Sequence, residues 1–96
     1  MRIVRIKSGG SESAAIEISS GFVRLDVLNE EKRTAWPEDF EELVSGVEGA
    51  ALARWYEAGG ETLLENISRR FVVPREKAEI TGGPSNVGGE GQRNFG

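Results

Sequence analysis

Residues 48–74 read EGAALARWYEAGGETLLENISRRFVVP, and this stretch decides the fold of the chain. It combines a dense apolar stripe with large aromatic side chains. The apolar residues recur at helical spacing on both sides of Gly59-Gly60, which predicts two amphipathic helices joined at the glycine pair. Ser45 and Thr62 each precede a glutamate by three residues, the spacing of a capping box at a helix start. We expect these helices to cover a small sheet.

Three segments before this stretch alternate apolar and polar side chains, which is the period of a half-buried strand. They are residues 2–7, 14–19 and 22–28. The short Ser- and Gly-containing loops between them predict an antiparallel meander. After an expected turn at residues 29–32, residues 33–36 are a candidate for a short fourth strand.

The predicted fold class is α+β, because the strands come first and the helices follow. We expect an N-terminal antiparallel β-meander of three or four strands, then two to three helices in a winged-helix-like arrangement. This single domain is placed at residues 1–80. Residues 81–96 contain six of the thirteen glycines and show no apolar periodicity, so they are predicted to form a flexible tail.

The residue types that enzymes commonly use are scarce in this chain. It has no cysteine and no histidine, and therefore lacks the thiolate nucleophile, the commonest general base and the commonest metal ligand. We predict a protein that is not an enzyme and that holds no cofactor and no metal. The N-terminus is too charged for a signal peptide, and no apolar run approaches the roughly 20 residues of a membrane span. These features predict a cytoplasmic protein without a membrane partner.

Charge is unevenly distributed along the chain. Residues 36–81 hold five basic against ten acidic side chains, within a total net charge of −4. The basic residues of this half are Arg54, Arg69, Arg70, Arg75 and Lys77. On a helix-turn-helix they could read DNA, but glutamates nearby match them in number and predict solvated ion pairs instead. A cluster of acidic residues lies at a predicted helix start, where the positive end of the helix dipole stabilises negative charge. It comprises Glu38, Asp39, Glu41 and Glu42.

Three segments of the chain resemble the PqqD-like family, the recognition elements of ribosomal peptide biosynthesis. They are residues 28–30 (LNE), 49–59 (GAALARWYEAG) and 69–79 (RRFVVPREKAE). The resemblance implies a non-catalytic domain of three strands and a winged-helix trio. It also implies capture of a leader peptide as an added strand beside the third strand and against the last helix, which correspond here to residues 22–28 and 75–80.

The predicted function is a small acidic binding module that captures a peptide or protein partner by adding a strand to its sheet edge. The residues predicted to contact the partner are Phe22, Arg24, Asp26, Leu28, Arg70, Arg75 and Lys77. Two alternatives stay open: a winged-helix DNA-binding regulator, with nucleic acid as the less favoured partner, and an acidic phage or host-interaction protein of the inhibitor type. A homodimer through the uncovered sheet edge is compatible with each.

Overall fold

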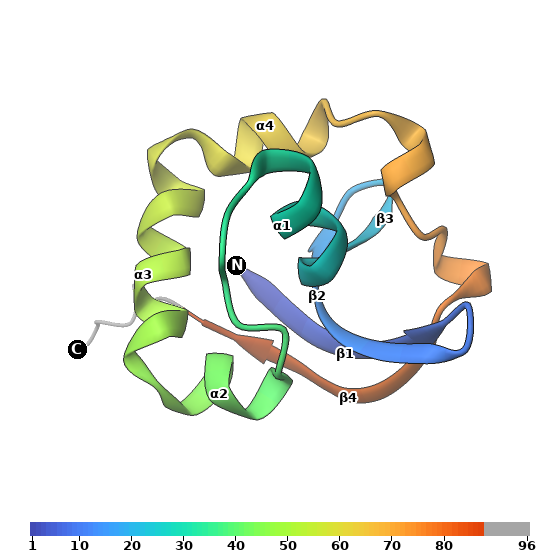
Figure 1. The fold of residues 1–96 in the computed structure, drawn as a ribbon, viewed down its shortest axis with the longest axis horizontal. Coiled ribbons are helices and arrows are strands. Elements are labelled where there is room, and N and C mark those ends of the chain that lie inside the picture. The colour runs from blue at the N-terminus through green and yellow to red at the C-terminus, as the bar shows by residue number, and fades with distance from the viewer. Residues whose placement is uncertain (88–96) are drawn as a thin grey trace.

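A four-stranded antiparallel sheet lies at the centre of the computed structural model, which describes residues 1–87 (Figure 1). The strands are β1 (Arg2–Ser8), β2 (Ser11–Ile18), β3 (Gly21–Arg24) and β4 (Glu79–Asn86). Their order across the sheet is β3-β2-β1-β4, so β3 and β4 form its two edges. The predicted α+β class, with an antiparallel sheet followed by helices, is confirmed.

The segment between β3 and β4 contains the helices. They are α1 (Leu25–Lys32), α2 (Phe40–Ser45), α3 (Val47–Trp55) and α4 (Glu61–Glu65). Three shorter turns complete this segment: η1 (Tyr56–Gly60), η2 (Arg69–Phe71) and η3 (Arg75–Lys77). No helix within residues 1–87 is long and apolar enough to cross a membrane.

The two faces of the sheet are covered in different ways. On one face, side chains such as Ile3, Ile16 and Val23 form the main core with apolar residues from all four α-helices. On the other face, a smaller cluster contains Val4, Ile6, Ala15 and Phe22, against which Val73 and Ala78 pack. Residues 69–78 therefore cover the face that the helices leave open, and we call this segment the strap. Figure 1 shows it as the orange segment on the right, between α4 and β4.

The third strand is shorter than predicted. It ends at Arg24, and the residues that follow form α1 rather than the rest of a strand and a turn. Leu25 and Leu28 are fully buried at the i, i+3 spacing of a helix face, while Arg33 closes the helix in a left-handed conformation. The alternation over residues 22–28 also fits a short strand that runs directly into a helix, and burial selects that arrangement.

The fourth strand does not come from residues 33–36, which are neither strand nor helix. It is β4, which includes residues predicted to be a flexible tail, so the domain boundary at residue 80 is wrong. Beyond β4, the Val87 N–H donates to the Met1 carbonyl oxygen at 2.9 Å. Residues 88–96 lie outside the described residues.

The helical stretch predicted after residue 48 is confirmed as two helices around a glycine joint. Gly59 has φ 134° and ψ −15°, a conformation that favours glycine, and it separates α3 from α4. The two capping boxes are wrong, because neither helix has a side-chain cap and Ser45 Oγ instead donates to the Glu41 carbonyl at 2.7 Å. The second helix, α4, ends at Glu65.

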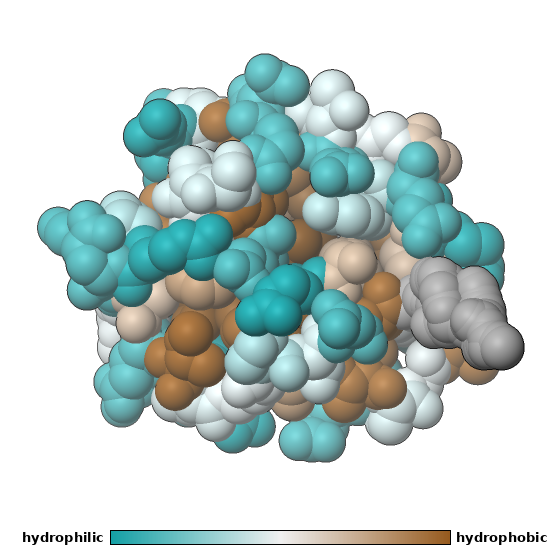
Figure 2. All heavy atoms as spheres, turned by 180° about the vertical axis from the view of Figure 1, so that it is seen from behind, coloured by the Kyte–Doolittle hydropathy of each residue, from teal (hydrophilic) through white to brown (hydrophobic). Residues whose placement is uncertain are grey.

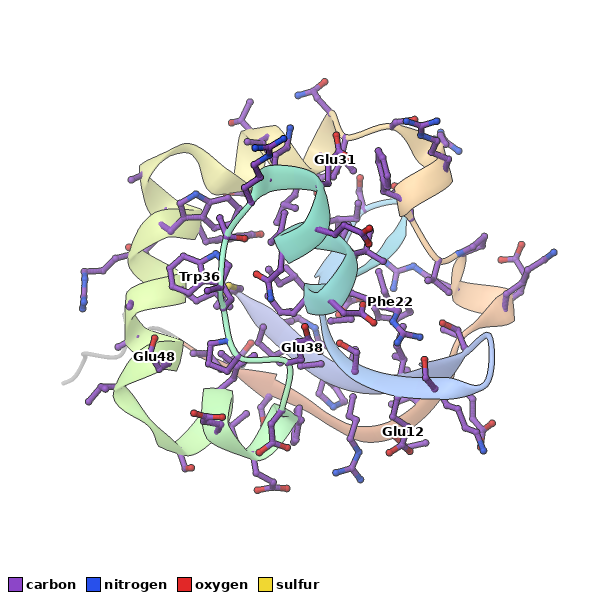
Figure 3. The ribbon with its side chains drawn as sticks, viewed as in Figure 1. Glu12, Phe22, Glu31, Trp36, Glu38 and Glu48 are labelled. Carbon is purple, nitrogen blue, oxygen red and sulfur yellow. The ribbon has the colours of Figure 1, made fainter. Side chains whose placement is uncertain are left out.

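Residues 33–39 form a connection that crosses the main core without regular structure. Trp36 from this connection packs against Trp55 of α3, with ring centroids 6.2 Å apart (Figure 3). The Ala14 N–H donates to the Glu38 carbonyl at 2.9 Å, which ties the connection to β2. Both contacts hold the segment over the helical side of the sheet.

Candidate functional site

The edge of β3, where the sequence predicts partner capture, is already paired within this chain. The Phe22 N–H donates to the Val73 carbonyl at 2.9 Å, and the Val73 N–H donates to the Phe22 carbonyl at 2.8 Å. Val73 belongs to the strap. One residue of the chain itself thus occupies the position that an added strand would take.

Arg75 fixes the strap two residues after this bridge. Its guanidinium donates from Nη1 to Glu17 Oε2 and from Nη2 to the Ile18 carbonyl, both at 2.7 Å. The Arg75 Cζ atom also lies 5.4 Å from the centroid of the Phe22 ring. A single side chain therefore binds β2 by hydrogen bonds and β3 by stacking.

Glu17 is the anionic centre of this contact. Arg2 Nε donates to Glu17 Oε1 at 2.6 Å, opposite the oxygen that Arg75 binds. The hydrogen bonds from Arg2 and then from Arg75 hold the pKa of Glu17 below its ordinary value. A carboxylate held ionised between two arginines is a weak proton acceptor, so Glu17 serves as a docking anion.

Arg24, a second predicted contact residue, has a structural role at the other end of β3. It is buried and forms a fork with Asp26, from Nε to Oδ1 at 3.0 Å and from Nη2 to Oδ2 at 2.8 Å. Its remaining donors bind main-chain and hydroxyl oxygens of Ser8 and Ser11 at 2.8 to 3.1 Å. These bonds attach the β1–β2 turn to β3 and use every side of the guanidinium.

Of the other predicted contact residues, Leu28, Arg70 and Lys77 join neither of these contacts. Leu28 is fully buried in the main core, so its assignment to a partner surface is wrong. Phe22 is only 3% exposed and can meet a partner only after the strap moves. Arg70 lies over the Phe71 ring at 4.8 Å and is exposed, as is Lys77 in η3. The structure thus brings together Phe22 and Arg75 in one contact and Arg24 and Asp26 in another.

The opposite edge of the sheet has no such cover. Strand β4 pairs with β1 alone, and within residues 1–87 no other main chain is bonded to it. Ile80, whose Cα partner is Ile6, keeps half of its side chain exposed. Figure 2 shows the molecule from behind, and on that face apolar atoms reach the surface between hydrophilic side chains. This is an edge with an accessible apolar side chain.

Only part of the β4 edge is regular. Its pairing with β1 shifts register on both sides of Arg5, and Pro84 has no N–H to donate. Arg5 donates from Nη2 to the Thr81 carbonyl at 2.7 Å and lies 5.9 Å from the Phe40 ring centroid. Bulges, proline and an inward cation are features that protect edge strands from uncontrolled pairing. One shift falls between Ile80 and Gly82, so regular pairing is confined to residues 79 and 80, and a strand added along residues 79–82 would pass one bulge before the second shift and Pro84.

Three observations on the described residues concern groups that could hold a metal or transfer a proton. Within residues 1–87 no three His, Cys, Asp or Glu side chains lie close enough to hold a metal ion. Ser19 donates its N–H and hydroxyl to Glu65, and these bonds lower the pKa of that carboxyl and make it a poor base. Burial, followed by the charges of Glu61 and Glu65, raises the pKa of Tyr56 above the ordinary value of 10.0, so its phenol is a still weaker acid than a free tyrosine.

The structure also shows where the charged residues lie on which the two alternative functions depend. Ion pairs within residues 1–87 join Arg2 and Arg75 to Glu17, and Arg24 to Asp26, so the predicted pairing among helical charges is wrong. Arg69 and Arg70 lie in the single turn η2 rather than on a helix long enough for a DNA groove. The predicted acidic cluster lies at the start of α2: Glu38 and Asp39 come just before the helix, and Glu41 and Glu42 lie in its first turn (Figure 3).

Sequence reasoning did not single out Glu17 or Val73, and it placed Ile80 in the partner region only through the resemblance, as part of a helix and not of an edge strand. The pair Val72-Val73 before Pro74 carried a usable signal, because β-branched residues ahead of proline favour extended backbone. Glu17 and Ile80 carried no such signal in the local sequence, since the contact of Glu17 with Arg75 and the edge position of Ile80 depend on which strands are neighbours.

Comparison with known proteins adds no relative. No family model, no curated protein and no solved structure matches this chain. The PqqD-like resemblance therefore stays a prediction from the sequence.

Proposed function

We propose that this chain is a non-enzymatic binding module that captures an extended segment of a peptide or protein partner, and that residues 79–82 of β4 are the docking edge. The main observation in support is the contrast between the two edges. The β3 edge is bonded to Val73, whereas the β4 edge pairs only with β1 and carries the half-exposed Ile80.

The partner would pair its main chain with this short edge and place an apolar side chain against Ile80. Main-chain bonds supply affinity in such strand addition, and side-chain contacts supply choice. One bulge interrupts the edge between Ile80 and Gly82, and the second register shift with Pro84 ends the usable edge after Gly82. A short extended segment fits this edge better than a long strand does.

Selection from a library of displayed peptides tests the proposal, with the variant Ile80→Lys as the comparison. Wild-type protein should enrich peptides whose binding Ile80→Lys abolishes. Val47→Lys is the matched control, because Val47 is 82% exposed but lies at the start of α3, whose first turn approaches Val87, next to the end of β4 opposite to residues 79–82. This control should bind the same peptides as wild type.

Amide chemical shifts then locate the contact. A selected peptide should shift the amides of residues 79–82 and leave those of residues 21–24 in place. Peptides that bind Ile80→Lys as well as wild type, or that shift only residues 21–24, would reject the β4 edge. A library that yields no binder to wild-type protein would reject the function itself.

A further inference from the structure

The strap has the properties of a segment that can leave the sheet while the rest of the chain stays folded. Its two turns, η2 and η3, contain no buried residue. Beneath it, Val4, Ile6 and Phe22 are each at most 3% exposed. Segments with few buried apolar side chains open at lower free energy than the core they cover.

The attachments of the strap to the sheet edge are few and lie close together. Main-chain pairing amounts to the two bonds between Phe22 and Val73, and Pro74, which has no N–H, follows at once. The other polar contacts come from Arg75, through Glu17 and the Ile18 carbonyl. Loss of this one side chain would remove both ionic and hydrogen-bonded attachment of the strap to β2.

We propose that the strap is an intramolecular latch, closed by Arg75, that opens locally and uncovers the β3 edge. In the closed state Val73 fills the main-chain positions of that edge and Arg75 covers the Phe22 ring. In the open state the Phe22 side chain and its main-chain groups face solvent and can pair. The latch is therefore an autoinhibitory contact at β3, and it does not depend on partner capture at β4.

The charged groups around the latch offer a matched control. Arg2 and Arg75 both bind Glu17, but Arg2 comes from β1 and Arg75 from the strap. Arg2→Ala and Arg75→Ala make the same change in charge beside the same carboxylate. Only Arg75→Ala removes an attachment of the strap.

Amide hydrogen exchange measured residue by residue tests the latch. The reporters are the N–H groups of Val73 and Phe22, which bond each other's residues across the contact. In Arg75→Ala both should exchange about tenfold faster than in wild type, from the loss of charge-assisted hydrogen bonds. In Arg2→Ala the rates should stay within about twofold of wild type. Ala15, in the β1–β2 pair, should keep its rate in all three proteins.

A second measurement needs no variant. Low concentrations of urea should leave Val73 exchange in the wild type almost unchanged, because local opening exposes little surface, while exchange at Ala15 should accelerate. The latch would be rejected if Val73 and Ala15 showed the same urea dependence. It would equally be rejected if Arg75→Ala left Val73 unchanged, or accelerated Val73 and Ala15 by the same factor.

Discussion

The two edge strands of this sheet are protected from uncontrolled pairing in different ways. The β3 edge is four residues long and is closed by a bonded residue of the strap, Val73. The β4 edge is eight residues long and is protected by register shifts and Pro84, with no covering segment among residues 1–87. A closed edge must be opened before it can pair with another strand. An irregular edge is accessible, but only a short part of it can pair regularly. This difference supports our placement of partner capture at β4.

Removal of one apolar side chain at each edge should show the largest contrast. Phe22→Ala removes an almost fully buried ring and should lower the free energy of unfolding by about 3 to 5 kcal/mol. Ile80→Ala removes a half-exposed side chain and should cost about 1 kcal/mol or less. Urea unfolding measures both. Equal losses would contradict the view that β3 is a closed edge and β4 an accessible one.

A methyl group at Gly21 should disturb the closed edge next most strongly. Gly21 has φ +152°, and an added Cβ would lie 2.4 Å from the Val73 carbonyl oxygen. Gly21→Ala should therefore cost about 2 to 3 kcal/mol in the free energy of unfolding, from backbone strain together with the clash. It should also accelerate hydrogen exchange of the Val73 amide.

Gly10→Ala is the control for this substitution. Gly10 also has a positive φ of +88°, but an added Cβ there meets nothing within 4 Å. We expect a loss of about 1 kcal/mol from strain alone, with no change at the Val73 amide. If the two alanine variants lost the same stability, the close approach of the strap to Gly21 would be in doubt.

The regular strands could be predicted from the sequence because their side chains alternate between two different environments. In β1, Ile3 faces the helices while Val4 and Ile6 face the strap, and this pattern is local. The segment after Arg24 was ambiguous, because Val23, Leu25 and Val27 would share one face of a continuing strand, whereas Leu25 and Leu28 share one face of a helix. Only the burial of both leucines in the main core decides between these two interpretations.

The edges themselves could not be predicted from local pattern. Strand β4 is rich in glycine, contains Pro84 and pairs with β1 across most of the chain, as the bond from Arg5 to Thr81 illustrates. Its bulges remove the alternation on which strand prediction depends. The closure of β3 likewise depends on Val73, far along the chain from Phe22. Which edge is accessible follows from strand order, and strand order is a long-range property.

The smallest expected effect is a pH dependence of the closed edge through Glu17. Because its pKa is lowered in the folded protein, Glu17 stabilises the fold above the ordinary glutamate value of 4.5, and this contribution is lost as the pH falls through the lower folded value. Glu17→Gln should therefore be less stable than wild type at pH 7, by about 1 kcal/mol or less, since the pair is partly exposed to solvent. Urea unfolding at several pH values between 7 and 3 measures the difference.

The pH dependence of the stability difference between wild type and Glu17→Gln distinguishes Glu17 from the other acidic groups. Glu65 also has a lowered pKa, through Ser19, but it titrates in both proteins and cancels when wild type and Glu17→Gln are compared. The gap between the two proteins should narrow below pH 4.5, because protonated Glu17 then resembles glutamine in charge. A gap that stayed constant down to pH 3 would mean that the stability difference does not come from the ionisation of Glu17. The β3 edge would then be closed by packing and main-chain bonds, with no contribution from the charge on Glu17.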